Sequence, residues 1–250
     1  MCEVIAIVSG KGGVGKSTLA RAAGLALSRS GKKVCLIDLD MGLRSLDILL
    51  GLQDRVVFDL ADLGEGMCRL KQALVRPRDN ENLALISAAQ LRGGEAIGQV
   101  QLSRVVKGLK PHFDMVLIDC PAGIGRGFLN ALHVSDRAVL VSVPGAVELR
   151  DAERVRGLVR HLGLADPGLV LNRVRPGDME DEHFGLKAYR EKLEGIRLLG
   201  LVPEEIPLGE EGAAGQALET AAFNLAGEER PIQEIRRPRL WKRLALAIRG

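Results

Sequence analysis

A glycine-rich segment near the amino terminus has the composition and spacing of a phosphate-binding loop. After the apolar run 4–8, the chain reads Gly10, Lys11, Gly12, Gly13, Val14, Gly15, Lys16, Ser17 and Thr18. Glycines let successive backbone N–H groups converge on phosphate oxygens, and the start of a following helix adds partial positive charge. Lys16 is placed to reach the β- and γ-phosphates, and the Ser17 hydroxyl to ligate Mg²⁺. The segment predicts ATP and Mg²⁺ as cofactors, because a ligand-free turn would not need this strand, spacing, lysine and serine together.

Three aspartates stand at the ends of apolar, strand-like runs. Asp38 and Asp40 end one run, and Asp119 ends another. In open parallel sheets the ligand binds beyond the carboxyl ends of the strands, where carboxylates hold Mg²⁺ directly or through water. We place the Mg²⁺ site among Ser17 and these aspartates: Asp119 holds the metal, Asp40 orients the attacking water, and the deeper Asp38 is structural or supports the metal ligands. Taken alone, each aspartate could instead cap a strand or a turn.

Apolar runs rich in β-branched residues alternate along the chain with segments of helical periodicity. The expected strands are 4–8, 33–38, 83–87, 115–119, 138–143, 169–172 and 198–202. The expected helices are 16–30, 95–108, 128–133, 147–162, 183–193 and 213–223. Continuous rather than alternating hydrophobicity predicts strands buried on both faces. The predicted fold class is α/β, a doubly wound, mostly parallel sheet with helices on both faces, formed by residues 1–226.

Length and composition fit one α/β domain that needs no disulfide or structural metal. The 250 residues are 46% hydrophobic, which is enough to bury a full core. The four cysteines are scattered, without zinc-like spacing, so we expect buried thiols in a reducing cytosol. The amino terminus does not read as a secretory signal, and no apolar run reaches the roughly 18 residues that span a bilayer. We therefore expect a protein that is first soluble in the cytoplasm.

Charge is divided unevenly along the chain. Residues 236–250 hold six basic and no acidic side chains, whereas the rest of the chain holds 29 basic and 32 acidic ones. We expect a tether at 227–237 and an amphipathic helix at 238–250, with Pro238 at its start. Its apolar face and flanking cations comprise Leu240, Trp241, Leu244, Ile248, Lys242 and Arg243. A short basic helix with the chain's only tryptophan predicts an interfacial anchor on an anionic membrane.

A single tail of this kind would bind lipid weakly, because ordering it costs on the order of 1–2 kcal/mol per residue. Two tails joined in a dimer gain avidity through effective concentration. Two further interpretations of the tail remain open: it packs back as a C-terminal helix, or it binds nucleic acid. The second would use the cations but not the apolar face.

A second lysine, Lys11, lies inside the phosphate loop. The pattern Lys-Gly-Gly-x-Gly-Lys-Ser resembles the deviant Walker A motif of the MinD/ParA superfamily of ATPases. The resemblance implies a homodimer that sandwiches ATP, in which Lys11 reaches the partner's nucleotide as an arginine finger would. The alternative is an exposed lysine that only solvates the loop.

Further stretches are more similar to the MinD branch, the septum site-determining ATPases of bacterial cell division, than to partition proteins. They are 41–51, 119–124, Pro144, 150–151, 172–173, 202–204 and 227–231. The resemblance implies a Mg²⁺-dependent ATPase that lies on the inner face of the cell membrane in its ATP state. It also implies two partners, a MinC-like division inhibitor and a spatial regulator. It further implies an adenine pocket formed by Asn172, Arg173, Pro203 and Glu204, any of which could instead serve a turn.

Some positions depart from that family pattern. The family has glutamate where this chain has Gly125 and Gly145, and segments 175–193 and 209–223 also differ. The departures leave open a nucleotide-dependent scaffold with little hydrolysis. A DNA-partition ATPase with a basic, DNA-binding tail and a flagellar-number ATPase stay open as well. An iron–sulfur ATPase is set aside because the cysteines are not paired.

Overall fold

The computed structural model describes residues 1–40, 45–88, 97–205, 209 and 211–235. In this part of the chain, parallel strands form one seven-stranded sheet in the order β3-β2-β4-β1-β5-β6-β7. The strands are β1 (Glu3–Val8), β2 (Val34–Asp38), β3 (Leu83–Ile86), β4 (Met115–Asp119), β5 (Arg137–Ser142), β6 (Gly168–Val174) and β7 (Leu198–Pro203). From β1 the chain forms β2 and β3 on one side, returns to place β4 between β2 and β1, and then adds β5, β6 and β7 on the other side. The carboxyl end of β1 is therefore at the topological switch point, where ligands bind.

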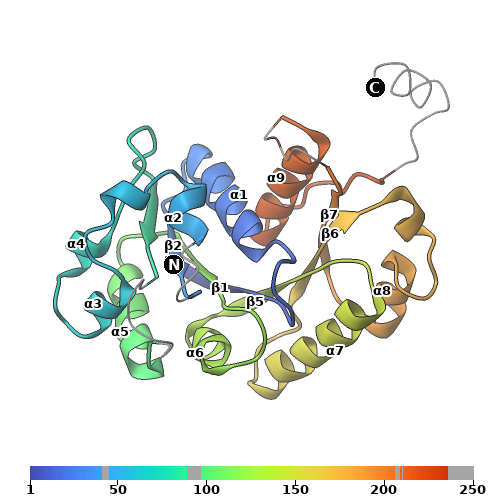
Figure 1. The fold of residues 1–250 in the computed structure, drawn as a ribbon, viewed down its shortest axis with the longest axis horizontal. Helices are drawn as coiled ribbons and strands as arrows, with labels where there is room; N and C mark the ends of the chain where they lie inside the picture. Colours follow the sequence, from blue (N-terminus) through green and yellow to red (C-terminus); the bar gives the residue numbers. More distant parts are fainter. Residues whose placement is uncertain (41–44, 89–96, 206–208, 210, 236–250) are drawn as a thin grey trace.

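Helices cover both faces of the sheet (Figure 1). They are α1 (Lys16–Arg29), α2 (Ser45–Leu49), α3 (Leu60–Gly64), α4 (Leu70–Ala73), α5 (Gln99–Leu109), α6 (Arg126–Val134), α7 (Ala146–His161), α8 (Leu186–Lys192) and α9 (Ala213–Leu225), with 3₁₀ turns η1 (Gln53–Arg55) and η2 (Pro176–Met179). On the α1 and α9 side, Ile5 and Ile7 of β1 enter the core. On the α5, α6 and α7 side, Val4 and Val8 do so. Both faces of this strand are buried, which confirms the predicted doubly wound α/β class.

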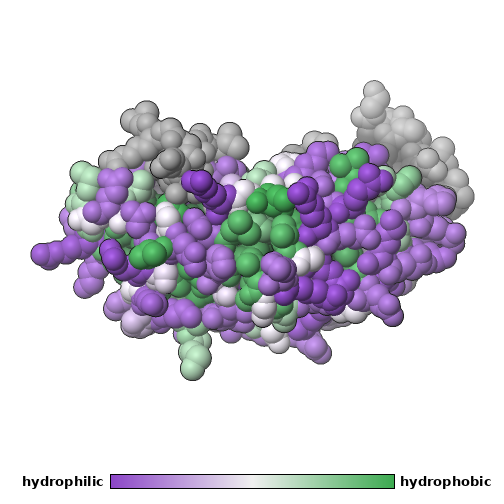
Figure 2. Space-filling view, turned by 90° about the horizontal axis from the view of Figure 1, so that it is seen from below, coloured by the Kyte–Doolittle hydropathy of each residue, from purple (hydrophilic) through white to green (hydrophobic). Residues whose placement is uncertain are grey.

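Figure 2 looks onto the face that lies below in Figure 1, where a mostly hydrophilic surface carries a green, apolar patch near its middle. Partly buried side chains that pack against the core beneath the helices include Leu129, Val134 and Leu158. Apolar atoms make up much of the surface of any folded protein. Among the described residues, no helix is long and apolar enough to cross a membrane.

The expected strands are all present, whereas the short helices α2, α3 and α4 were not predicted. Each of these has only four or five residues, too few to display a helical period. Asp59 caps α3 by accepting hydrogen bonds from the N–H groups of Ala61 and Asp62, a local signal that could have marked its start. The expected helix at 95–108 is found as α5, which begins at Gln99. The predicted amphipathic helix 238–250 lies outside the described residues.

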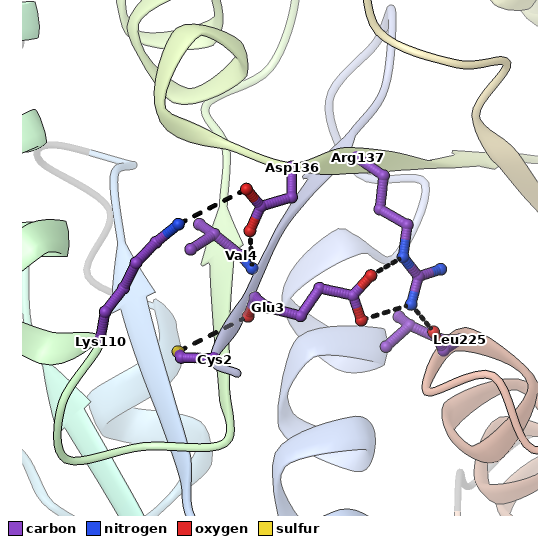
Figure 3. A network of polar contacts seen from close by, with 7 residues as sticks. All are labelled: Cys2, Glu3, Val4, Lys110, Asp136, Arg137 and Leu225. Carbon is purple, nitrogen blue, oxygen red and sulfur yellow. Dashed lines mark hydrogen bonds and ion pairs between the residues drawn. The ribbon is translucent and has the colours of Figure 1, made fainter.

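A polar network ties the amino end of the sheet to α9 (Figure 3). The Arg137 guanidinium donates to both carboxylate oxygens of Glu3, at 2.5 and 2.9 Å, and also to the Leu225 carbonyl at the end of α9. Asp136 accepts a hydrogen bond from the Val4 N–H at 2.8 Å. Because β1 carries the phosphate loop at its other end, this network fixes the strand that positions the loop.

The segment after α9 packs against the domain. The Asn224 side chain donates to the Leu199 and Arg230 carbonyls at 2.9 and 3.0 Å, and it accepts a hydrogen bond from the Arg230 N–H at 2.6 Å. The Arg230 guanidinium lies 3.1 Å from the centroid of the Phe223 ring. Ile232 also packs against the core. The described part of the segment 227–237 is therefore in contact with the domain as far as residue 235.

Candidate active site

The phosphate loop joins β1 directly to α1. Gly13 and Gly15 have φ angles of 75° and 104°, a left-handed conformation that side chains strongly disfavour. Gly15 is also the N-cap residue of α1 and supplies no side chain to occupy the first N–H groups of the helix. These groups are left to bind an anion, with the helix dipole favouring it. Lys16, only 6% exposed, begins the helix beside them.

Two neighbouring elements close around the loop. Asn172, near the end of β6, donates its side-chain N–H to the Val14 carbonyl at 2.8 Å. A Cβ atom on Gly15 would lie 2.3 Å from that amide nitrogen, and one on Gly10 would lie 2.5 Å from the Cβ of Asp151 in α7. The glycines at these positions are therefore required by packing as well as by phosphate binding. Asn172 serves as a support for the loop in this structure.

Two of the predicted aspartates face each other across adjacent strands. Asp38 on β2 is paired in register with Asp119 on β4. Asp38 accepts hydrogen bonds from the N–H groups of Asp40, at 2.9 Å, and Leu46, at 3.2 Å. Both oxygens of Asp119 are buried and accept no hydrogen bond of good geometry from the described residues, although the Ser17 hydroxyl is near enough to lower the pKa of Asp119 in part. Asp38 thus organises the loop after β2, while Asp119 has unused acceptor capacity.

Burial raises the pKa of all three carboxyl groups. The pKa of Asp119 rises to about 7, because of burial and then the nearby charge of Asp38. Burial raises the pKa of Asp38 to about 6 and also raises that of Asp40, which the charge of Lys16 lowers in part. Three close carboxylates with one lysine favour an additional cation. Oxygen ligands of this kind suit Mg²⁺, so the residues present fit the metal that the sequence predicts.

Ser45, which sequence analysis did not single out, contacts the predicted Mg²⁺ ligand Ser17. Its hydroxyl donates to the Ser17 hydroxyl over 3.0 Å. Ser45 begins α2, just after residues that lie outside the described part of the chain. Its position before a short apolar segment could have identified it as a helix start, but not as a neighbour of the phosphate loop.

Lys11 forms an ion pair within the same chain. Its Nζ lies 2.8 Å from Oε1 of Glu148, in the first turn of α7. The hydrogen bond with Lys11 lowers the pKa of Glu148, and the same bond raises the pKa of Lys11. Gly145, the N-cap of α7, makes room for the carboxylate, because a Cβ atom there would lie 2.3 Å from Oε2 of Glu148. The resemblance to the superfamily predicts a role for Lys11 in a partner's site, whereas this contact within the chain was not predicted.

The residues of the predicted adenine pocket lie at the carboxyl ends of two neighbouring strands. Asn172 and Arg173 belong to β6, and Pro203 ends β7, which pairs with β6. Arg173 has a φ of 51°, an uncommon value for a residue with a side chain. Glu204 accepts two hydrogen bonds from Arg175, at 2.5 and 3.2 Å. The structure brings these residues to one edge of the sheet, with Glu204 turned to Arg175 and Asn172 to the phosphate loop.

The other glycine that departs from the family pattern, Gly125, is the N-cap of α6. A Cβ atom at this position would meet nothing within 4 Å, so the backbone there would accept a larger side chain. The six predicted membrane residues, Leu240 to Arg243, Leu244 and Ile248, lie outside the described part of the chain.

The whole domain matches known proteins. A family model named ParA, described as NUBPL iron-transfer P-loop NTPase, matches residues 1–230. The septum site-determining protein MinD of Bacillus subtilis (strain 168) is 39% identical over 248 residues, which cover 93% of this chain and 92% of that protein. The chain belongs to the MinD family.

Solved structures of MinD proteins agree with this assignment. The MinC:MinD cell division protein complex of Aquifex aeolicus matches with a TM-score of 0.84 and 34% identity, over 94% of this chain and all of that chain. MinD of Pyrococcus horikoshii OT3, solved as a complex with Mg-ADP, matches with a TM-score of 0.77 and 28% identity, over 92% of this chain and all of that chain. The resemblance predicted from the phosphate loop and from the stretches after Asp40 and Asp119 is confirmed for this MinD family member.

Proposed function

We propose that this chain is an ATP-hydrolysing switch that helps to place the bacterial division septum. It binds ATP and Mg²⁺, dimerises in the ATP state, resides on the membrane as a dimer and leaves it after hydrolysis. The observation that carries this proposal is the match to MinD structures along nearly the whole chain, which includes the phosphate loop and its aspartates. The relatives are named for septum placement, which favours this function over DNA partition or flagellar counting.

Each site residue has a role that its surroundings support. The open N–H groups at the start of α1 and Lys16 bind the phosphates. Ser17 and Asp119 hold Mg²⁺, with Asp38 behind them, and the metal when bound neutralises charge on the phosphate oxygens. Asp40 orients the attacking water: it lies at the carboxyl edge of the sheet and is only partly buried. The ends of β6 and β7, where Asn172, Arg173, Pro203 and Glu204 gather, would hold the adenine.

Dimerisation completes the site through Lys11. This side chain is 55% exposed and belongs to the loop that surrounds the phosphates, so a facing copy of the chain could receive it. A positive charge delivered from outside the protomer stabilises the transferring phosphoryl group only when two chains meet. Hydrolysis is thereby coupled to the dimer.

Membrane residence is assigned to the tail. The domain can be followed to residue 235, and the basic amphipathic segment begins directly after it. A lone tail binds weakly, whereas the two tails of a dimer bind together, so that nucleotide state controls membrane residence. The protein is cytoplasmic in its monomeric state and peripheral on the inner face of the membrane with ATP. A MinC-like division inhibitor and a spatial regulator are its partners; the Aquifex MinC:MinD complex supports the first of these.

Sedimentation with anionic liposomes tests the switch. The full-length chain and a chain truncated after Ile235 are compared in Mg²⁺ with ATP or ADP, together with a Trp241→Glu variant that keeps all the tail cations. Full-length protein should pellet with ATP and much less with ADP, and neither altered protein should pellet. Lipid binding that is absent, or equal in ATP and ADP, would refute the membrane switch, and salt-sensitive binding of DNA by the same proteins would support the partition alternative.

A further inference from the structure

A pocket of about 710 Å³ opens at the end of the sheet opposite to the phosphate loop. It is lined by α4 and by the segments that lead into β2, β3 and β4, the three adjacent strands on the α4 side of the molecule (Figure 1). Because all strands are parallel, their amino ends lie away from the carboxyl edge where Asp38 and Asp119 stand. A ligand in this pocket would leave the nucleotide site free.

The lining is strongly cationic. Lys33, Arg69, Lys71 and Arg76 contribute positive charge, and among the described lining residues only Glu81 contributes a carboxylate. None of the four cations forms an ion pair with a residue in the part of the chain that the structure describes. This local excess contrasts with the rest of residues 1–235, where acidic side chains outnumber basic ones. Unpaired cations gathered around a concave surface create a potential that attracts anions.

The inner surface is apolar. Phe113 is 5% exposed and belongs to the main core, and Leu70 and Leu74 pack against the same core from α4. The Arg76 guanidinium carbon lies 5.5 Å from the centroid of the Phe113 ring. Cations thus surround an apolar floor, an arrangement that suits a ligand with one charged end and one apolar end.

The backbone around the pocket is well fixed. The Arg76 side chain donates to the Glu81 carbonyl, and Arg55 donates to the Arg76 carbonyl at 2.5 Å. Val75 pairs with Leu85 of β3 in an antiparallel bridge. The Lys33 N–H donates to the Asp114 carboxylate at 2.8 Å, which holds the start of β2 beside the start of β4. A pocket built on such a framework is preformed, so binding would not require the chain to reorganise first.

We propose that this pocket, which we name the basal pocket, binds a small organic anion: a phosphate monoester or carboxylate that carries an apolar group. A guanidinium group can donate two parallel hydrogen bonds to a pair of oxygens on either head group, and Arg69 and Arg76 supply two such groups. The volume lies in the range of roughly 300–1,000 Å³ that small-molecule sites occupy. The apolar end of the ligand lies on Phe113, Leu70 and Leu74. The site is separate from nucleotide binding and membrane attachment.

Calorimetric titration of the full-length chain tests this inference. Saturating Mg-ADP and a parallel Lys16→Ala variant keep the phosphate loop from contributing. The probes are phenyl phosphate, benzoate, inorganic phosphate and benzyl alcohol, so the head group and the apolar group are tested separately. Phenyl phosphate or benzoate should bind at least about tenfold more tightly than inorganic phosphate or benzyl alcohol, because only they use both the cations and the floor. The relative affinity of the two shows which head group is preferred.

Variants locate the binding. The double change Arg69→Ala with Lys71→Ala should weaken phenyl phosphate binding by about tenfold or more, since it removes two of the four cations. Lys33→Ala should also weaken phenyl phosphate binding, although Lys33 precedes β2 and is not part of the α4 segment. Arg78→Ala, an exposed cation outside the lining, is the matched control and should bind as the parent does. The inference is overturned if no organic anion binds, if inorganic phosphate binds as well as phenyl phosphate, or if the pocket variants bind like the control.

Discussion

Lys11 of the phosphate loop and Glu148 of α7, 137 positions apart in the chain, form an ion pair with 2.8 Å between Nζ and Oε1. In the single chain, therefore, Lys11 is held by its own protomer rather than extended to another. If Lys11 acts on a partner's nucleotide, dimerisation must first break this contact. The ion pair then opposes dimer formation by a modest amount, because exposed ion pairs are weak.

Replacing the carboxylate by an amide should shift this balance. Glu148→Gln weakens the hold on Lys11 while keeping the shape of the side chain, so the ATP-dependent dimer should form at roughly a few-fold lower protein concentration. Analytical ultracentrifugation with a non-hydrolysable ATP analogue measures the dissociation constant of the dimer. Glu153→Gln, on the same helix, is the control and should match the parent. A dimer that is weaker in Glu148→Gln would show that Glu148 orients Lys11 for dimerisation instead of restraining it.

The Asn172 side chain should strengthen nucleotide binding, because its hydrogen bond supports the phosphate loop. Asn172→Ala removes the hydrogen bond to the Val14 carbonyl, so Mg-ADP should bind about tenfold more weakly, the equivalent of roughly 1–1.5 kcal/mol. Fluorescent nucleotide titration gives the dissociation constant. Asn130→Ala removes a similar side-chain bond to a carbonyl, that of Ile97, far from the loop, and should leave the affinity unchanged. Equal effects of the two changes would mean that the loss reflects general destabilisation.

Asp119 should be needed for the metal rather than for the nucleotide. Asp119→Asn keeps the size of the side chain but removes the charge that Mg²⁺ requires, so ATP should still bind while hydrolysis falls by about a hundredfold or more. The parent should bind nucleotide more tightly when Mg²⁺ is added, and the variant should gain much less. A full Mg²⁺ response in Asp119→Asn would assign the metal to other residues.

These site predictions show what the sequence could and could not supply. The phosphate loop and Asp119 were predicted because strand, loop and helix follow one another locally and spacing alone specifies them. Glu148, Ser45 and Arg175 were missed, since each matters only through a partner distant in the chain: Lys11, Ser17 and Glu204. The apolar strands revealed the sheet, whereas α2, α3 and α4 were too short to show a period. The missed site residues depend on tertiary contacts, which no local pattern encodes, whereas the missed helices are simply shorter than the period that would reveal them.

Low pH should destabilise the folded protein by protonating Asp166, which pairs with Arg156 and Arg160 near the end of α7. Asp166 accepts two hydrogen bonds from Arg156, at 3.0 and 2.9 Å, and two from Arg160, and these bonds hold the pKa of Asp166 far below its usual value. A depressed pKa in the folded state adds stability above the unfolded pKa of about 4, and that stability is lost as pH falls below it.

Asp166→Asn should therefore lower the free energy of unfolding by about 1–2 kcal/mol at pH 7, because it leaves the buried Arg156 without its carboxylate. The difference in the free energy of unfolding between the parent and Asp166→Asn should disappear as pH falls from about 5 to 2. Urea unfolding followed by circular dichroism measures it. Glu182→Gln, which breaks the exposed pair with Lys187, is the control and should have no measurable effect. A difference that is the same at pH 7 and pH 3 would contradict the electrostatic origin.

The most direct test of the central claim, a dimeric ATPase whose Lys11 works in the partner's site, is to mix two inactive variants. Lys11→Ala lacks the lysine it would supply, and Asp40→Ala lacks its own water-orienting carboxylate. In a mixed dimer the Lys11→Ala protomer keeps its own Asp40 and receives Lys11 from its partner, so one complete site forms. ATP turnover of an equimolar mixture should recover to about a quarter of the parent rate, since half of the dimers are mixed and each has one intact site. If the mixture stays as inactive as the separate variants, Lys11 acts within its own chain and the account of a dimer-coupled switch is wrong.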